Sequence, residues 1–443
     1  MKPMILVTAP VQTRSGYGNH ARDICRALIE SDKYDVKIQS VPWGSTPLTA
    51  LDKDDKSHQE IQKRLLRQPT LPKQPELHLH IVIPNEFTKF GKKNIGMTAG
   101  IESTIPPAEW VQGCNRMDKV IFTSEFSKTV FEGVGFDQLD DRTKQKVGEL
   151  KLEKPTDVLF EGADTDLYKE TNDISDKLNK KFSIIEEDFC FLFVGHWLQG
   201  NLGEDRKDIG MMIKTFFTTF KNMDNPPALI LKTSGANFSI IDRNDIKKKI
   251  NDIKGTFGKT KLPNLYLLHG DLTDEEMNEM YNHPKVKAHV SFTHGEGFGR
   301  PLLEASLSGK PVIASNWSGH KDFLPTEKAV MIPGSLTKVP KEAFPDNIYV
   351  EGSQWFSVNY PVASNAMKDV YDNYKKYLPN AKKLTFENKN KFSLNAMTKE
   401  FEKILDKYLP EFEQVEQVSL KLPQLKPAGK TTSNIKLPKL KKK

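Results

Sequence analysis

The stretch HGEGFGRPLLEASLSGKPVIAS, residues 294–315, decides the fold and places the candidate site. The apolar segment VSFTH leads into it and PVIAS ends it, and both are typical of buried parallel strands. Pro301 fits the start of a helix, where its missing N–H costs nothing, and Gly309 fits the helix end. The stretch therefore predicts strand, glycine loop, helix and strand. In open α/β sheets, ligands bind at such loops, beyond the carboxyl ends of the strands.

Two glutamates in this stretch indicate what the ligand is. Glu304 falls in the first helical turn, where an acid is also explained by the helix dipole alone. Glu296 lies in the glycine loop itself, although backbone N–H groups at a helix start favour phosphate and a carboxylate opposes it. A carboxylate there is useful if it accepts hydrogen bonds from sugar hydroxyls. One glutamate for ribose, one for a transferred sugar and N–H groups for a diphosphate describe a sugar-nucleotide site.

Outward from this stretch, short apolar runs alternate with amphipathic segments through most of the chain. This alternation predicts βαβ units with parallel sheets. The series runs through residues 1–170, restarts after a polar segment, and continues through 186–355. Residues 356–410 are helical in pattern. We therefore predict an α/β protein with two doubly wound domains and closing helices, and we find no simple sequence repeat.

Composition narrows the class of protein. The chain has 443 residues, of which 37% are apolar, and no run approaches the length needed to span a bilayer. The N-terminal MKPMILVTAP is interpreted as a first strand, because no small-residue cleavage site follows it. Three widely spaced cysteines, Cys25, Cys114 and Cys190, form no disulfide or metal pattern. These features predict a cytoplasmic protein.

The net charge of +7 comes from the C-terminus. Residues 421–443 contain eight lysines and no acid, so the rest of the chain carries −1. Residues 411–443 are rich in Lys and Pro and are predicted to be a disordered basic tail. The tail is either a solvated terminus or a peripheral contact with an anionic surface, membrane or nucleic acid.

The motifs together resemble the retaining glycosyltransferases of the GT4 family. The segment EGFGRPLLEASLSGKPVIAS resembles the family's E-x7-E segment, with Glu296 and Glu304 as the pair. FEGADTDLY at 160–168 resembles the segment that ends the family's first domain, and residues 191–216 and 264–281 resemble segments of its second domain. The resemblance implies the GT-B fold, in which two Rossmann-like domains face a cleft.

The resemblance assigns a donor site by position. It implies that Glu304 binds the donor ribose and that Glu296 contacts the hydroxyls of the transferred sugar. The N–H groups of Phe298, Gly299 and Arg300 are expected to face the sugar and the diphosphate.

The basic pair of the family is only partly present. Lys207 matches the family lysine that neutralises the diphosphate, but His196 stands where the family has arginine. We expect Arg206, beside Lys207, to compensate, because arginine binds phosphate in a bidentate manner. An exposed loop pair is the alternative for Arg206 and Lys207.

The first domain contributes three further candidates. Gly16 and Gly18 match the family's N-terminal glycine loop, which approaches the diphosphate across the cleft, although a plain strand–helix turn also explains them. Glu102 is the candidate for the acceptor side, with an ordinary loop acid as the alternative. Four other histidines are interpreted as structural: His20, His78, His80 and His269.

The resemblance implies transfer of a hexose from a nucleoside-diphosphate sugar to a carbohydrate or lipid-linked acceptor, with retention of anomeric configuration. It implies no metal ion and no cofactor, and no metal-binding motif is evident. Two alternatives stay open at this point. One is glycosylation of modified DNA bases, with the lysine tail holding DNA. The other is a non-catalytic scaffold that binds sugar nucleotides, which the change at His196 favours.

Overall fold

A computed structural model describes residues 2–44, 46–68, 70–140, 142–198, 200–235, 238–343 and 348–408. The predicted basic tail, residues 411–443, lies outside the described residues. No helix among the described residues is long and apolar enough to cross a membrane.

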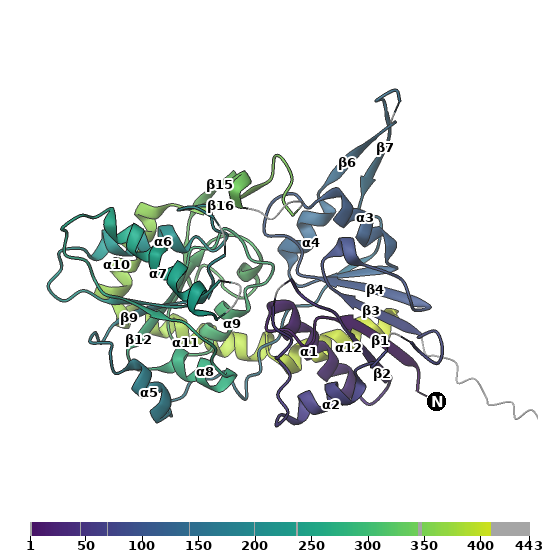
Figure 1. The fold of residues 1–443 in the computed structure, drawn as a ribbon, viewed down its shortest axis with the longest axis horizontal. Helices are drawn as coiled ribbons and strands as arrows, with labels where there is room; N and C mark the ends of the chain where they lie inside the picture. Colours follow the sequence, from purple (N-terminus) through teal and green to yellow (C-terminus); the bar gives the residue numbers. More distant parts are fainter. Residues whose placement is uncertain are drawn as a thin grey trace, which may run out of the picture.

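The first domain is built on a six-stranded parallel sheet with the strand order β2-β1-β3-β4-β5-β8. A hairpin, β6 with β7, projects away from the body of this domain (Figure 1). The strands are β1 Met4–Ala9, β2 Asp35–Ser40, β3 Leu77–Ile81, β4 Lys93–Thr98, β5 Lys119–Phe122, β6 Gly135–Leu139, β7 Lys146–Lys151 and β8 Thr156–Val158. The helices are α1 Gly16–Glu30, α2 Lys56–Arg64, α3 Ala108–Arg116 and α4 Glu125–Glu132, with a 3-10 turn at Pro84–Glu86.

The second domain repeats this plan with a six-stranded parallel sheet in the order β11-β10-β9-β12-β13-β14. The strands are β9 Cys190–His196, β10 Ala228–Ser234, β11 Leu265–Leu268, β12 Val286–Ser291, β13 Val312–Ser315 and β14 Val330–Ile332, with an antiparallel hairpin of β15 Gly334–Lys338 and β16 Gln354–Val358. The helices are α5 Asp176–Phe182, α6 Ile209–Phe220, α7 Ile240–Gly255, α8 Asp274–Asn282 and α9 Arg300–Ser306, with 3-10 turns at Gly319–Asp322 and Lys341–Ala343.

Three C-terminal helices tie the two domains together. They are α10 Tyr360–Asp372, α11 Tyr374–Lys391 and α12 Leu394–Tyr408. Leu384 of α11 belongs to the core of the second domain, whereas Met397 and Phe401 of α12 are buried in the core of the first. Figure 1 shows α11 and α12 following one another from the second domain to the first. The predicted class, two doubly wound domains with closing helices, is confirmed; the exact domain boundaries stay predictions.

Each sheet reverses its strand order at one point. In the first sheet the reversal lies between β1 and β3, and in the second between β9 and β12. At such a point, neighbouring loops leave the carboxyl ends of the strands in opposite directions and open a crevice. The loop that contains Glu296 follows β12, so it lies at the reversal of the second sheet.

Candidate active site

The loops after β9 and β12 are fastened to each other through their backbones. The carbonyl oxygen of Arg206 accepts hydrogen bonds from the N–H of His294 at 2.9 Å and from Oγ1 of Thr293 at 3.3 Å. The guanidinium of Arg206 donates in turn to the carbonyl oxygen of Gly295 at 3.0 Å. Segments some ninety residues apart in the chain are thereby joined, and the basic pair is held against the glycine loop.

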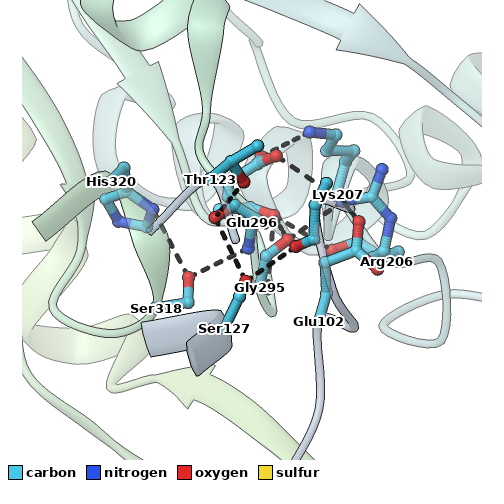
Figure 2. Close-up of polar contacts among 12 residues, drawn as sticks. Glu102, Thr123, Ser127, Arg206, Lys207, Gly295, Glu296, Ser318 and His320 are labelled. Carbon is cyan, nitrogen blue, oxygen red and sulfur yellow. Dashed lines mark hydrogen bonds and ion pairs between the residues drawn. The ribbon is translucent and has the colours of Figure 1, made fainter. Parts of the chain in front are cut away.

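Lys207 and Arg206 both point toward the carboxylate of Glu296 (Figure 2). Lys207 forms an ion pair with one carboxylate oxygen, and Arg206 lies 3.6 Å from the other. Burial alone would raise the pKa of Glu296, but the two adjacent cations overcome it and hold this pKa at about 2. The basic pair that the sequence predicts therefore forms one charged cluster with Glu296.

Two aspartates that the sequence analysis missed frame the basic pair. Asp205 accepts a hydrogen bond from the N–H of Ile209 at 3.2 Å, and Asp208 accepts one from the hydroxyl of Tyr360 at 2.8 Å. Both carboxyl groups are buried, and burial raises their pKa values. Asp208 also adopts a left-handed conformation, with φ of 51°. These contacts fix the turn from which Lys207 reaches Glu296.

The glycine loop lies directly on the first domain. A Cβ added to Gly297 would lie 2.5 Å from the carbonyl oxygen of Ala99, and one added to Gly295 would lie 2.6 Å from that of Glu102. The hydroxyl of Ser124 donates to the carbonyl oxygen of Gly297 at 2.6 Å. These two glycines are therefore required because the backbones of the two domains approach closely.

Glu102 is also brought to this cluster. Its carboxylate lies 3.1 Å from the guanidinium of Arg206, across the contact between the domains. Arg206 therefore lies between two carboxylates, Glu102 from the first domain and Glu296 from its own.

Glu304 lies in a second charged cluster beside the first. Its two oxygens accept hydrogen bonds from Nε of Arg300 at 3.0 Å and from the hydroxyl of Tyr281 at 3.3 Å. Arg300 also contacts Asp23 of helix α1 at 2.5 Å, so it bridges the two domains. Burial raises the pKa of Glu304 to about 7, although the charge of Arg300 acts in the opposite direction. Asp23 carries no sequence signal that distinguishes it from other acids on helices.

Helix α9 begins close to the predicted position, but Glu304 lies beyond its first turn, in which the sequence analysis had placed it. Gly299 has a φ of +99°, and the helix begins at Arg300, one residue before Pro301. Within the described part of the chain, the N–H groups of Phe298, Gly299 and Arg300 donate to no backbone or side-chain acceptor. The ring of Phe298 is buried against Phe323, so only the backbone of this residue is available to a ligand.

Three donor-side candidates remain: His196, Gly16 and Gly18. His196 ends β9 with an exposed side chain, and its Nδ1 lies 3.2 Å from the hydroxyl of Ser234. A Cβ on Gly18 would lie 2.3 Å from the carbonyl oxygen of Thr13, so the turn itself requires this glycine. A Cβ on Gly16 would meet nothing within 4 Å. The turn therefore explains Gly18 and leaves Gly16 without a local structural reason.

Three of the four histidines interpreted as structural have hydrogen-bond partners. His78 contacts the hydroxyl of Thr8, His80 accepts from the N–H of Thr88, and His269 contacts Asp242. His20 is different, because it is buried and neither ring nitrogen has a partner. No group of three or more His, Cys, Asp or Glu side chains among the described residues is placed to hold a metal ion. The need for a metal or a cofactor stays a prediction.

Glu161, in the loop after β8, gives the first testable prediction. It is buried, and burial raises its pKa to about 7 despite the opposing charge of Arg300. Because the folded pKa lies above the unfolded value, its contribution to stability is present below pH 4.5 and is lost as the pH rises through 7. Ionising Glu161 at pH 8 costs about 3 kcal/mol. Glu161→Gln is therefore expected to gain stability relative to the wild type between pH 5 and pH 8.

Urea denaturation of both proteins at these two pH values measures this gain. A difference in the free energy of unfolding that stays constant with pH would contradict the raised pKa.

Comparison with known proteins gives a family match over the second domain. Residues 176–346 match the family model described as glycosyl transferases group 1. This range contains the basic pair, the glycine loop and both glutamates of the candidate site. No curated protein sequence matches the chain.

Solved structures of glycosyltransferases share the fold over nearly the whole chain. HepE from Anabaena, in complex with UDP and glucose, is 15% identical, with a TM-score of 0.55, covering 91% of this chain and 100% of its own. Sucrose-phosphate synthase from Thermosynechococcus elongatus is 12% identical, with a TM-score of 0.58 and coverage of 92% and 99%. Trehalose 6-phosphate synthase from Burkholderia multivorans is 11% identical, with a TM-score of 0.55 and coverage of 92% and 99%. The predicted resemblance to GT-B glycosyltransferases is confirmed; membership of GT4 and retention stay predictions.

Proposed function

We propose that this chain, whose second domain matches the group 1 glycosyl transferases, moves a hexose from a nucleoside-diphosphate sugar to a carbohydrate or lipid-linked acceptor. The observation that carries the proposal is the convergence of Lys207, Arg206 and Glu296 beside the N–H groups at the start of α9. Cations and free N–H groups suit a diphosphate, and the carboxylate beside them suits sugar hydroxyls.

In this proposal, each cluster binds a different part of the donor. The diphosphate lies between Lys207, Arg206 and the N–H groups of residues 298–300, replacing Glu296 as the partner of the two cations. Glu296 then accepts hydrogen bonds from the transferred sugar. Glu304 binds the ribose hydroxyls and is oriented by the contacts with Arg300 and Tyr281.

The chemistry then needs no side-chain nucleophile. The bond between the anomeric carbon and the phosphate oxygen breaks, and the acceptor oxygen bonds to that carbon on the same face. The acceptor proton passes to the departing diphosphate, and the anomeric configuration is retained. Negative charge grows on the diphosphate as the bond breaks, so preorganised cations and N–H groups stabilise the transition state more than the ground state. We expect this step to proceed without a bound metal.

UDP-glucose is the first donor to test. The solved structures of HepE, which share this fold, contain UDP with glucose in one case and UDP-glucose in another. Release of UDP from UDP-glucose in the presence of sugar acceptors measures the proposed activity directly. Turnover with none of the common nucleoside-diphosphate hexoses would contradict the proposal.

The role of Glu304 gives a second prediction. Glu304→Ala removes the carboxylate proposed to hold two ribose hydroxyls, and each such hydrogen bond to a charged group is worth about 1.5–3 kcal/mol. Loss of one of these hydrogen bonds alone is expected to lower the affinity for UDP by about 10- to 100-fold, and loss of both by more. Isothermal titration calorimetry with UDP measures the change.

A matched control is available in the same domain. Glu276 is buried to the same extent, but its ion pairs are with Lys177 and Lys181, away from the candidate site. Glu276→Gln is expected to lower stability and to leave UDP affinity within about twofold of the wild type. Equal UDP affinity in the wild type and Glu304→Ala would refute the assignment of Glu304.

A further inference from the structure

Two titratable side chains of the first domain, His20 and Glu161, line one small cavity. His20 of α1 is 3% exposed, and neither ring nitrogen has a hydrogen-bond partner. Glu161 is 7% exposed and forms no hydrogen bond or ion pair with the described residues. Both line a cavity of about 10 Å³, which has room for about one water molecule. Most buried polar groups in native proteins are satisfied, so the two unpartnered nitrogens of His20 at this cavity call for an explanation.

The position of the cavity favours a ligand site. Its other lining residues are Tyr17, Ile81, Thr98, Ala99 and Thr123. They come from α1 and from the carboxyl ends of β3, β4 and β5, or just beyond them, and α1 follows β1. The cavity therefore lies at the strand-order reversal of the first sheet, between β1 and β3, where open α/β sheets bind ligands.

The cavity also lies next to the proposed donor site. Ala99 and Thr123, which line it, contact the glycine loop at Gly297. Glu161 lies within electrostatic reach of Arg300, the first residue of α9. The glycine loop therefore contacts two residues of the cavity wall.

The two side chains select hydroxyl groups over ions. Burial lowers the pKa of His20 to about 4, so its imidazole is neutral and offers one donor and one acceptor. A hydroxyl can accept from the imidazole and donate to the Glu161 carboxyl at the same time. An anionic ligand is disfavoured by Glu161 and by Asp23, and a cation is disfavoured by Arg300. Ile81 and Ala99 provide the apolar part of the cavity wall.

We propose that His20 and Glu161 form the subsite that binds the acceptor hydroxyl group, on the first-domain side of the cleft. This inference rests on the proposed sugar transfer and adds the residues that hold the acceptor. The pair positions the hydroxyl toward the donor sugar. It takes no proton, because in the proposed step the acceptor proton passes to the departing diphosphate while the new glycosidic bond forms.

The test observes His20 directly by NMR, using the imidazole resonances of the full-length protein. The His20→Asn variant assigns the His20 signal among the ten histidines of the chain. Methyl α- and β-glucopyranoside, mannopyranoside and galactopyranoside are titrated with and without UDP. We expect at least one glycoside to shift the His20 signal in a saturable manner. The Glu161→Gln substitution is expected to lower the affinity for that glycoside about tenfold or more.

Each outcome of this titration decides one claim. The subsite is overturned if no glycoside shifts the His20 signal. It is also overturned if glycosides shift the signals of other histidines but not that of His20. A glycoside shift at His20 in a protein that binds none of UDP, GDP, ADP and TDP would support the subsite while contradicting the proposed donor. His80→Gln, which alters a buried histidine of the same domain that does not line the cavity, is expected to leave glycoside affinity unchanged.

Discussion

Replacing Lys207 with alanine is expected to lower turnover with the donor sugar by about 10²–10³-fold, the size of effect seen when one preorganised charge-stabilising donor is removed. The ammonium group is partly buried and pairs with Glu296, so it is already held where the departing diphosphate is proposed to bind. Its loss leaves Arg206 as the one described cation in contact with Glu296. Steady-state kinetics with UDP-glucose measures the loss.

Lys119 provides the control for this variant. It is a buried lysine in an ion pair with Asp157, and it begins β5 in the first domain, away from the candidate site. Lys119→Ala is expected to destabilise the protein and to keep turnover within about threefold of the wild type, since breaking a buried pair costs stability wherever it lies. If the two variants lost turnover equally, a general loss of folding would explain the result, and the special role of Lys207 would be refuted.

Replacing Glu296 with glutamine is expected to separate turnover from binding. The amide keeps the shape but loses the charge that accepts hydrogen bonds from the transferred sugar, and turnover is expected to fall about 10²-fold. UDP has no sugar to contact Glu296, and in the variant Lys207 and Arg206 no longer pair with a carboxylate. The affinity for UDP is therefore expected to stay equal or to increase. Reduced UDP affinity with unchanged turnover would contradict this role.

The arrangement of the second domain could be predicted from the sequence because its signals are local. Strand, glycine loop and helix follow one another within residues 290–306, and the glycine with left-handed φ is Gly299, as the motif requires. Local signals could not place Lys207 beside Glu296, because 88 residues lie between them in the chain. The family resemblance supplied that link, and a single sequence without it gives only two charged loops.

Other parts depend on tertiary contacts that no local pattern reveals. Strand β4 reads KNIGMT, with few large apolar residues, and it includes Gly96 because the ring of Phe87 occupies the space of a Cβ. Asp23 resembles any helical acid until Arg300 of the other domain contacts it. His20 was grouped with structural histidines because the sequence does not show which imidazoles find partners. The missing information in each case is which distant element packs against the residue.

A thermal-shift titration of the wild-type protein with UDP, GDP, ADP, TDP and CMP, with and without magnesium, tests the central claim most directly. A ligand that binds only the folded state stabilises it by about 2.7 kcal/mol at a hundredfold excess over Kd. We predict that one nucleoside diphosphate raises the melting temperature without magnesium, and that the shift is reduced in Lys207→Ala and Glu304→Ala. A shift with none of the five nucleotides, or an equal shift in both variants, would contradict a nucleotide-sugar site at Glu296 and Glu304.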